Sequence, residues 1–289
     1  MMLRIAILPA LLIAICHAGE PLFIDDQKLA SNFEAKLGRL AQEGNLLTLN
    51  KARKSIDRRK NEKIALPRFH PLLPESTSLY EKCAPAVVAI GTVYQCRKCD
   101  KWHQDGFSTG WIASPDGIVV TNAHLFEGET NDGLGVMTRD GRVFPVKEIL
   151  AADRDSDIAI LQIDTDGEKL PALSLAESAS PGEDVSVISH PQGRLYCLTN
   201  GRISRFHRQK YEENSKPTDW MSITADFAGG SSGGPVLNAK GEVLGMVAST
   251  LTAYSENSEC KAHPEPDVQM VFKDCVPLTS LRAMFEQRD

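Results

Sequence analysis

The 289-residue sequence lacks an excess of positive charge, since 32 lysines and arginines face 38 aspartates and glutamates, for a formal net charge of −6. Nucleic-acid binding as a main activity requires a concentrated positive face, so this class of protein is not expected. One basic cluster occurs, at residues 51–63, with seven basic and two acidic side chains. It is typical of a solvated helix face or a linker; a processing site or an anionic-surface contact is the alternative.

The apolar run at the amino terminus is too short to cross a bilayer, which takes about 20 residues. It extends from Ile5 to Ile15, after the single charge of Arg4 and before the small residues Ala18 and Gly19. This pattern is typical of a cleavable secretory signal over residues 1–18, with an uncleaved anchor as the alternative. We therefore expect an exported protein (periplasmic, cell-surface or secreted) with no stable membrane span after signal removal.

Alternating strands and helices are also missing from most of the chain. Between Val87 and Phe272, short β-branched runs recur about every ten residues, separated by Gly, Asp, Asn and Pro. About a dozen strands in one series indicate β-barrels or a sandwich and exclude a βαβ sheet. Three hairpin turns are predicted, at Pro115-Asp116-Gly117, Arg139-Asp140-Gly141 and Ala239-Lys240-Gly241.

Helices are predicted only near the ends of the chain. Between residue 21 and about residue 50, five apolar residues recur at helical spacing: Leu29, Phe33, Leu37, Leu40 and Leu47. Three prolines then mark a linker: Pro67, Pro71 and Pro74. We expect residues 19–75 to be a helical segment and linker, a candidate pro-segment, before a domain over residues 76–289 that ends in a helix at Thr279–Arg288.

The stretch Gly229–Pro235 packs four glycines around two serines and leads straight into an apolar strand. Such a turn presents one hydroxyl and points successive backbone N–H groups at a single spot, which is the geometry that holds an oxyanion. A serine hydroxyl is a poor nucleophile until a base takes its proton. The stretch therefore predicts a histidine and an orienting carboxylate elsewhere in the chain.

Candidates for both partners stand at the ends of apolar strands. His124 follows one such strand, a place where a histidine alone is more often a packed or capping residue. Asp157 directly precedes the apolar run Ile158–Ile163; aspartates there are usually turn formers, and Asp153 and Asp155 compete for the role. We favour Asp157, because its carboxylate would be desolvated against that run and still accept a histidine N–H.

Several segments, in order and at compatible spacing, carry a family resemblance: Ser108–Ile112, Thr121–His124, Asp155–Ala159, Gly182–Asp184, His190–Gly193, Asn200–Ser204, Gly230–Pro235 and Gly241–Gly245. Over residues 79 to 286 the chain resembles trypsin-like serine peptidases of the chymotrypsin fold, most closely the Deg/HtrA branch. The resemblance implies an all-β domain of two six-stranded antiparallel β-barrels, protein or peptide substrates, and no cofactor. Deg/HtrA enzymes usually carry a C-terminal PDZ domain, and none is expected here.

The resemblance also implies roles for single residues. Ser232 would attack the scissile carbonyl, with His124 as general base and then acid, and Asp157 as its orienter. The backbone N–H groups of Gly230 and Ser232 would form the oxyanion hole. Ser231 is the competing nucleophile, but the Ser-Gly-Gly-Pro that follows the family nucleophile begins at Ser232.

Two positions bear on specificity and activation. Asp226 lies six residues before Ser232, the offset at which trypsin-like enzymes place the carboxylate that selects Lys or Arg, although in Deg-like relatives a Thr-Asp pair near this point is structural. Ser231 stands where pancreatic-type enzymes hold an aspartate that pairs with a freshly cut N-terminus. Activation by such an insertion is therefore not expected.

Six cysteines remain after signal removal: Cys83, Cys96, Cys99, Cys197, Cys260 and Cys275. In an exported protein this even number permits up to three disulfides, and Cys83 and Cys275 flank the domain as a candidate pair. For Cys96 and Cys99 a disulfide is favoured over a structural zinc site or a redox role. These two cysteines and His103 fall short of four zinc ligands, so no metal is expected.

Taken together, the sequence predicts an exported serine endopeptidase that works through a His-Asp-Ser triad and an acyl-enzyme intermediate. The alternative is a catalytically silent protease-fold protein that binds or scaffolds. An esterase of another fold is disfavoured, because its Gly-x-Ser-x-Gly elbow requires an α/β pattern. The sequence predicts neither the preferred cleavage site nor an oligomeric state.

Overall fold

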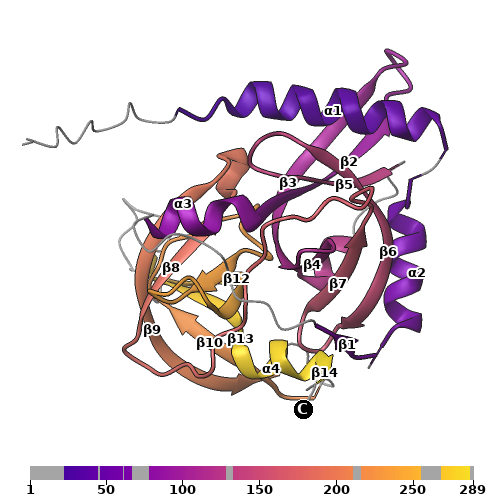
Figure 1. Cartoon of the computed structure of the whole chain (residues 1–289). Coiled ribbons are helices and arrows are strands. Elements are labelled where there is room, and N and C mark those ends of the chain that lie inside the picture. The colour runs from indigo at the N-terminus through magenta and orange to yellow at the C-terminus, as the bar shows by residue number, and fades with distance from the viewer. Residues whose placement is uncertain are drawn as a thin grey trace, which may run out of the picture.

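The computed structural model describes residues 23–44, 46–60, 62–66, 78–127, 133–210, 216–254 and 268–286. Two closed six-stranded barrels of antiparallel strands form most of this part of the chain (Figure 1). The expected signal and the proline-marked linker lie outside the described residues, so both stay predictions. Among the helices in these ranges, none is long and apolar enough to span a membrane.

The first barrel runs in the order β2-β3-β4-β7-β6-β5, and β5 closes it by pairing with β2. Its strands are β2 (Val87–Gln95), β3 (Trp102–Ser114), β4 (Ile118–Thr121), β5 (Gly133–Met137), β6 (Val143–Asp153) and β7 (Ile158–Ile163). Alternate residues of a strand point to opposite faces. Val119 and Leu161 pack in a core that also contains side chains of the helix at Leu49–Arg58. Val120 and Ile160 pack in a core that also contains side chains of the other barrel. Burial on both faces explains the nearly continuous apolar runs.

The second barrel runs in the order β10-β13-β12-β11-β8-β9, and β9 closes it against β10. Its strands are β8 (Asp184–Ser189), β9 (Cys197–Gln209), β10 (Thr218–Ile223), β11 (Pro235–Leu237), β12 (Val243–Tyr254) and β13 (Val268–Pro277). The predicted all-β fold of two six-stranded barrels is therefore confirmed. All three predicted hairpin turns are also confirmed, because Gly117, Gly141 and Gly241 have φ of +85°, +81° and +83° and close turns between paired strands.

Several strands are longer than the sequence predicts. β3 begins at Trp102, well before the β-branched run that starts at Thr109, and β12 continues past its apolar run to Tyr254. The added halves are hairpin arms that reach beyond the barrels, where side chains such as Leu251 and Tyr254 are more than half exposed. Without a core on one face, these arms lack the alternating or continuous apolar pattern by which strands are identified.

Two helices cover the first barrel; the amphipathic spacing predicts the first, whereas the second lies mostly in the basic cluster that follows. α1 (Asp26–Gln42) lies over β2, β3 and β5, and α2 (Leu49–Arg58) lies along β6 (Figure 1). The side chains of Asp25 and Thr48 cap them by accepting the backbone N–H groups of Lys28 and Lys51. The basic side chains of α2 are on its exposed face, and its apolar face is buried. The part of the basic cluster that lies on α2 is thus a solvated helix face.

The buried face of α1 is part of the barrel's core. Phe33 and Leu37 are fully buried, and the Phe33 ring meets Phe107 of β3 edge-on at 5.0 Å between centroids. We expect Phe33→Ala to lower the free energy of unfolding by about 3–5 kcal/mol, as for other large-to-small changes in cores. Urea unfolding followed by circular dichroism measures it. Phe23→Ala is the matched control, since Phe23 is 88% exposed; equal losses in both variants would contradict the packing argument.

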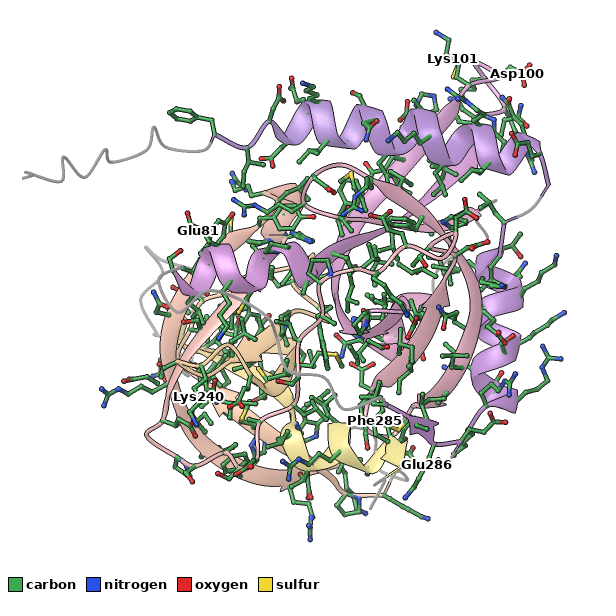
Figure 2. The ribbon with its side chains drawn as sticks, viewed as in Figure 1. Glu81, Asp100, Lys101, Lys240, Phe285 and Glu286 are labelled. Atoms are coloured by element: carbon green, nitrogen blue, oxygen red, sulfur yellow. The ribbon has the colours of Figure 1, made fainter. Side chains whose placement is uncertain are left out.

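The carboxyl-terminal helix is shorter than predicted. α4 spans Leu278–Ala283, and Phe285–Glu286 form a short strand, β14, parallel to β1 (Ile64–Ala65) (Figure 2). The buried Phe285 side chain and the hydrogen bond from Ile64 N to Met284 O hold this end extended. One further helix, α3 (Leu79–Cys83), begins at a Ser78–Glu81 capping box and leads into the 3-10 turn η1 (Ala84–Ala86). It is too short to produce a periodic pattern.

Candidate active site

His124 and Asp157 meet at the ends of two neighbouring strands. β4 ends at Thr121, and His124 lies in the 3-10 turn η2 (Ala123–Phe126) that follows. The Asp157 carboxylate accepts twice from this residue: from the backbone N–H at 2.9 Å and from Nδ1 at 2.8 Å. A third hydrogen bond joins the two strand ends, from Asn122 Nδ2 to the backbone carbonyl of Asp157. With the proton held on Nδ1, Nε2 is left as the basic nitrogen.

The turn between β6 and β7 explains why Asp157 has this position and its neighbours do not. Asp157 adopts φ of +56°, a left-handed conformation that aspartate tolerates better than most residues. The Asp153 carboxylate is used within the turn, where it accepts the N–H groups of Asp155 and Ser156. The Asp155 carboxylate lies 3.9 Å from Lys60 Nζ. Of the three aspartates, the structure brings Asp157 to His124.

Opposing effects set the pKa of His124. Burial alone would lower it, but the hydrogen bond and the negative charge of Asp157, with a smaller contribution from Glu127, raise the pKa above its ordinary value of 6.5. The paired carboxylate thus stabilises the imidazolium form. An imidazole in this environment accepts a proton more readily than a free one, as a general base requires.

The two serines of the glycine-rich turn differ sharply in their surroundings. Ser231 is fully buried, and its hydroxyl accepts from Ser189 Oγ at 3.0 Å. Ser232 is partly exposed and donates from Oγ to the carbonyl of Ala248 at 3.3 Å. Ala248 lines the same pocket as His124. No hydrogen bond joins His124 to Ser232 in the described part of the chain. Of the two serines, Ser232 is the one that is partly exposed and hydrogen-bonded to a residue of the histidine's pocket.

Backbone donors in the same turn are arranged in an alternating way. The N–H groups of Ser231, Gly233 and Gly234 all donate to backbone carbonyls. Those of Gly230 and Ser232 have no acceptor among the residues that the structure describes. Gly230 has φ of +93°, and a Cβ there would lie 2.4 Å from the carbonyl oxygen of His190. The turn therefore needs glycine at this position and leaves two N–H groups free to bind an anion.

Thr109 holds this turn in place, a role that sequence reasoning missed. Its hydroxyl donates to Gly230 O at 2.8 Å and accepts from His190 N at 3.1 Å, while its own N–H donates to Ser232 O. His190 begins the 3-10 turn η3 (Pro191–Gly193) and is fully buried, which lowers its pKa to about 4. The imidazole is thus neutral and accepts from Tyr196 N. The sequence offered one signal for this role: Thr109 lies in Ser108–Ile112, a segment that resembles a motif of the family.

A pocket of about 450 Å³ lies between the two barrels. The first barrel contributes His124, Asp157 and Arg154, and the second contributes Trp220 and Ala248. Charged groups line its outer part: Arg154 donates to Glu127 and to Asp57 of α2, and Lys216 faces the same space. Such a groove between barrels can receive an extended chain beside the imidazole.

Asp226 does not line this pocket. Its side chain is 88% exposed, and the nearest cation is Lys273 Nζ at 3.6 Å. Lys273 itself is largely buried, donates to the carbonyl of Phe227 and lies over that residue's ring. Thr199 donates to the carbonyl of Asp226. These contacts hold the backbone around Asp226, and its role in specificity stays a prediction.

The cysteines differ from the disulfide expectation. All five in the described part of the chain are free: Cys83, Cys96, Cys99, Cys197 and Cys275. The proposed bond between Cys83 and Cys275 is wrong, because the two side chains are buried in separate cores, Cys83 beside Gly241 and Cys275 within the second barrel. Burial raises the pKa of the Cys83 thiol to about 11. Cys260 lies outside the described residues.

Comparisons with known proteins agree with this architecture. Residues 108–246 match the family described as the trypsin-like peptidase domain. The chain is 30% identical over 218 residues to the "Probable periplasmic serine endoprotease DegP-like" of Halomonas elongata. This match covers 62% of the chain and 44% of that protein. It is 34% identical over 177 residues to "Serine protease HTRA1A" of Danio rerio, and this match covers 60% of the chain and 36% of that protein. The chain thus spans less than half the length of these relatives. The resemblance to trypsin-like and Deg/HtrA peptidases is confirmed.

Proposed function

We propose that this chain, whose residues 108–246 form a trypsin-like peptidase domain similar to the Deg/HtrA serine proteases, is a serine endopeptidase. The observation that carries the proposal is the His124–Asp157 pair, bonded at 2.8 Å, in a pocket that it shares with Ala248, the acceptor of the Ser232 hydroxyl. In this proposal His124 is the base, Asp157 its orienter and Ser232 the nucleophile. The N–H groups of Gly230 and Ser232, which donate to no acceptor among the described residues, support it.

In the proposed reaction, Ser232 Oγ attacks the carbonyl carbon of a peptide bond, and its proton passes to Nε2 of His124. The negative charge that develops on the carbonyl oxygen is stabilised by the N–H groups of Gly230 and Ser232, each donor contributing about 3–4 kcal/mol. His124 then returns the proton to the leaving amine. A water molecule, activated by the same imidazole, hydrolyses the acyl-enzyme and restores the serine.

Asp157 stabilises the imidazolium that forms. In the resting geometry the Ser232 hydroxyl donates to Ala248 O. Attack requires this hydroxyl to rotate toward Nε2 of His124. Catalytic hydrogen bonds are often long or misaligned in ligand-free enzymes and tighten when substrate binds.

Labelling with a fluorophosphonate probe tests the proposal. The probe forms a covalent bond with an activated serine, so the unmodified protein and Ser231→Ala become labelled, and Ser232→Ala does not. Ser231→Ala is the matched control, because it removes the neighbouring, buried hydroxyl. Labelling of Ser232→Ala would contradict the assignment. Absence of labelling in all three folded proteins would favour the silent binding or scaffolding protein.

Export is a separate part of the proposal. Its support is the apolar run of residues 5–15 and the periplasmic location in the name of the Halomonas relative. The substrates we propose are proteins or peptides in that compartment. Amino-terminal sequencing of the protein recovered from its host tests the signal, with a mature chain that begins near Gly19 as the expected result.

A further inference from the structure

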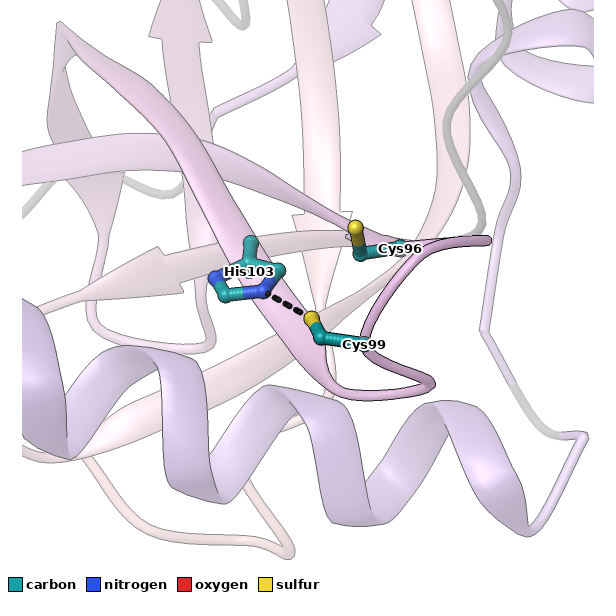
Figure 3. Close-up of side chains that lie close together, drawn as sticks. All are labelled: Cys96, Cys99 and His103. Carbon is teal, nitrogen blue, oxygen red and sulfur yellow. Dashed lines mark hydrogen bonds between the residues drawn. The ribbon is translucent and has the colours of Figure 1, made fainter.

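Three potential metal ligands meet at the tip of the β2–β3 hairpin, far along β3 from the proposed active site. The sulfur atoms of Cys96 and Cys99 and a ring nitrogen of His103 all lie within 4.8 Å of one another (Figure 3). Cys99 Sγ and His103 Nε2 are 3.0 Å apart. We propose that this cluster binds a Zn²⁺ ion through two thiolates and one imidazole, with water as the fourth ligand.

The donor set favours zinc over other common ions. Thiolate sulfur is a soft ligand that Mg²⁺ and Ca²⁺ avoid, whereas Zn²⁺ combines readily with sulfur and imidazole nitrogen. Typical bonds of about 2.3 Å to sulfur and 2.0–2.1 Å to nitrogen place tetrahedral ligands roughly 3.5–3.8 Å apart. The spacings in the cluster, from 3.0 Å to at most 4.8 Å, bracket this range. Side-chain rotations alone can therefore close the site around an ion.

The loop that carries the cysteines is already shaped for this task. Cys96 N donates to Lys101 O, and Asp100 N donates to Cys96 O, both at 2.8 Å. The backbone N–H groups of Lys98 and Cys99 donate to the Cys96 sulfur. The loop thus holds this sulfur in place beside Cys99 and His103.

The histidine has the outer contact expected of a metal ligand. Glu34 of α1 lies with Oε2 4.0 Å from His103 Nδ1, on the side of the ring opposite the thiols. The same oxygen accepts from the backbone N–H of Gln104 at 3.0 Å, which fixes the carboxylate. Carboxylates placed behind a ligating histidine orient the ring and raise its basicity. This arrangement distinguishes the cluster from two cysteines that merely share a turn.

The cluster lies beside a contact between two segments far apart in the sequence, the β2–β3 hairpin and α1. The ligands lie on the hairpin tip, whose outermost residues include Asp100 and Lys101 (Figure 2). Glu34 lies on α1, and the Trp102 side chain packs against Gly38 of the same helix, where an added Cβ would be 2.9 Å away. Zinc would therefore fix the tip of an exposed arm of the first barrel at the place where that arm contacts α1.

Cobalt titration of the reduced full-length protein tests the site. The Ser232→Ala variant is used to prevent self-cleavage, so metal binding is read independently of the proposed peptidase activity. We expect one Co²⁺ per chain, with sulfur-to-cobalt charge-transfer bands and the strong visible bands of tetrahedral coordination, and displacement by Zn²⁺. Cys99→Ser and His103→Ala should each abolish these bands, and Cys197→Ser, a thiol outside the cluster, should retain them.

Glu34→Gln provides a finer measurement, because glutamine can still accept the Gln104 N–H but carries no charge behind the imidazole. Loss of an outer-sphere partner typically weakens metal affinity by about 10–100-fold. Competition with a chromophoric chelator measures this shift for Zn²⁺. Reduced protein that binds no Co²⁺, or binding that Cys99→Ser leaves unchanged, would overturn the proposal. A Cys96–Cys99 disulfide without zinc in protein isolated from its host would also overturn it.

Discussion

Replacing Ser232 with alanine lowers kcat by a factor on the order of 10⁶, the loss seen when the nucleophile of a serine protease is removed. The physical reason is that the neighbouring hydroxyl of the glycine-rich turn cannot take its place, because Ser231 is fully buried and bonded to Ser189. Hydrolysis of a chromogenic peptide or of unfolded casein measures the loss. Ser249→Ala is the matched control, because Ser249 lines the same pocket without a role in the proposed reaction, and should change kcat by less than about tenfold.

A double variant that also replaces His124 tests whether the two residues act together. If Ser232 and His124 act as one unit, His124→Ala costs about as much as Ser232→Ala, and the double variant is no worse than either single one. Independent roles would instead multiply the two losses. A double variant that falls well below both single variants would therefore contradict the shared mechanism while leaving the fold intact, which circular dichroism checks.

The barrels and the triad candidates could be predicted from the sequence because both depend on short local patterns. The runs of β4 and β7 are apolar on both faces, since each strand separates two cores, and such runs are conspicuous. His124 and Asp157 stand at the ends of these strands, where a buried strand opens onto a groove. Strand β11 follows the glycine-rich turn directly, so its apolar residues mark in the sequence where the turn ends.

The parts that were missed depend on contacts between segments distant in the chain. Thr109 supports the oxyanion turn through atoms of Gly230, Ser232 and His190, and nothing in its local sequence specifies these partners. The pairing of Phe285 with Ile64 likewise stops α4 early. The Cys83–Cys275 pairing failed for the same reason, because flanking positions in sequence do not determine which core a side chain enters.

The candidate metal cluster shows a different limit. Counting ligands in sequence yielded two cysteines and a histidine, short of the four that a closed structural site needs. The fold adds the element that counting omits, which is Glu34 from α1, 70 residues from the hairpin that it contacts. Because this residue supports the site without binding the ion, no spacing pattern reveals it.

Replacing Asp157 with asparagine lowers kcat/KM by about 10⁴, the effect of this change in the general Ser-His-Asp mechanism. Asparagine can keep the acceptor for the His124 backbone N–H, and it tolerates the φ of +56° at this turn. Its amide group then faces Nδ1 as a donor. The imidazole is forced to carry its proton on Nε2, which leaves no base beside Ser232.

The pH profile separates this effect from simple misfolding. In the unmodified enzyme kcat/KM falls as pH drops through the pKa of His124, which Asp157 raises above 6.5 against the opposing effect of burial. Without the carboxylate, burial dominates and the pKa falls, so the acid limb of the profile moves to lower pH. Asp155→Asn is the matched control: Asp155 also lines the pocket but lies near Lys60, so both rate and profile should stay close to those of the unmodified enzyme. An unshifted acid limb in Asp157→Asn, or a larger loss in Asp155→Asn, would transfer the orienting role away from Asp157.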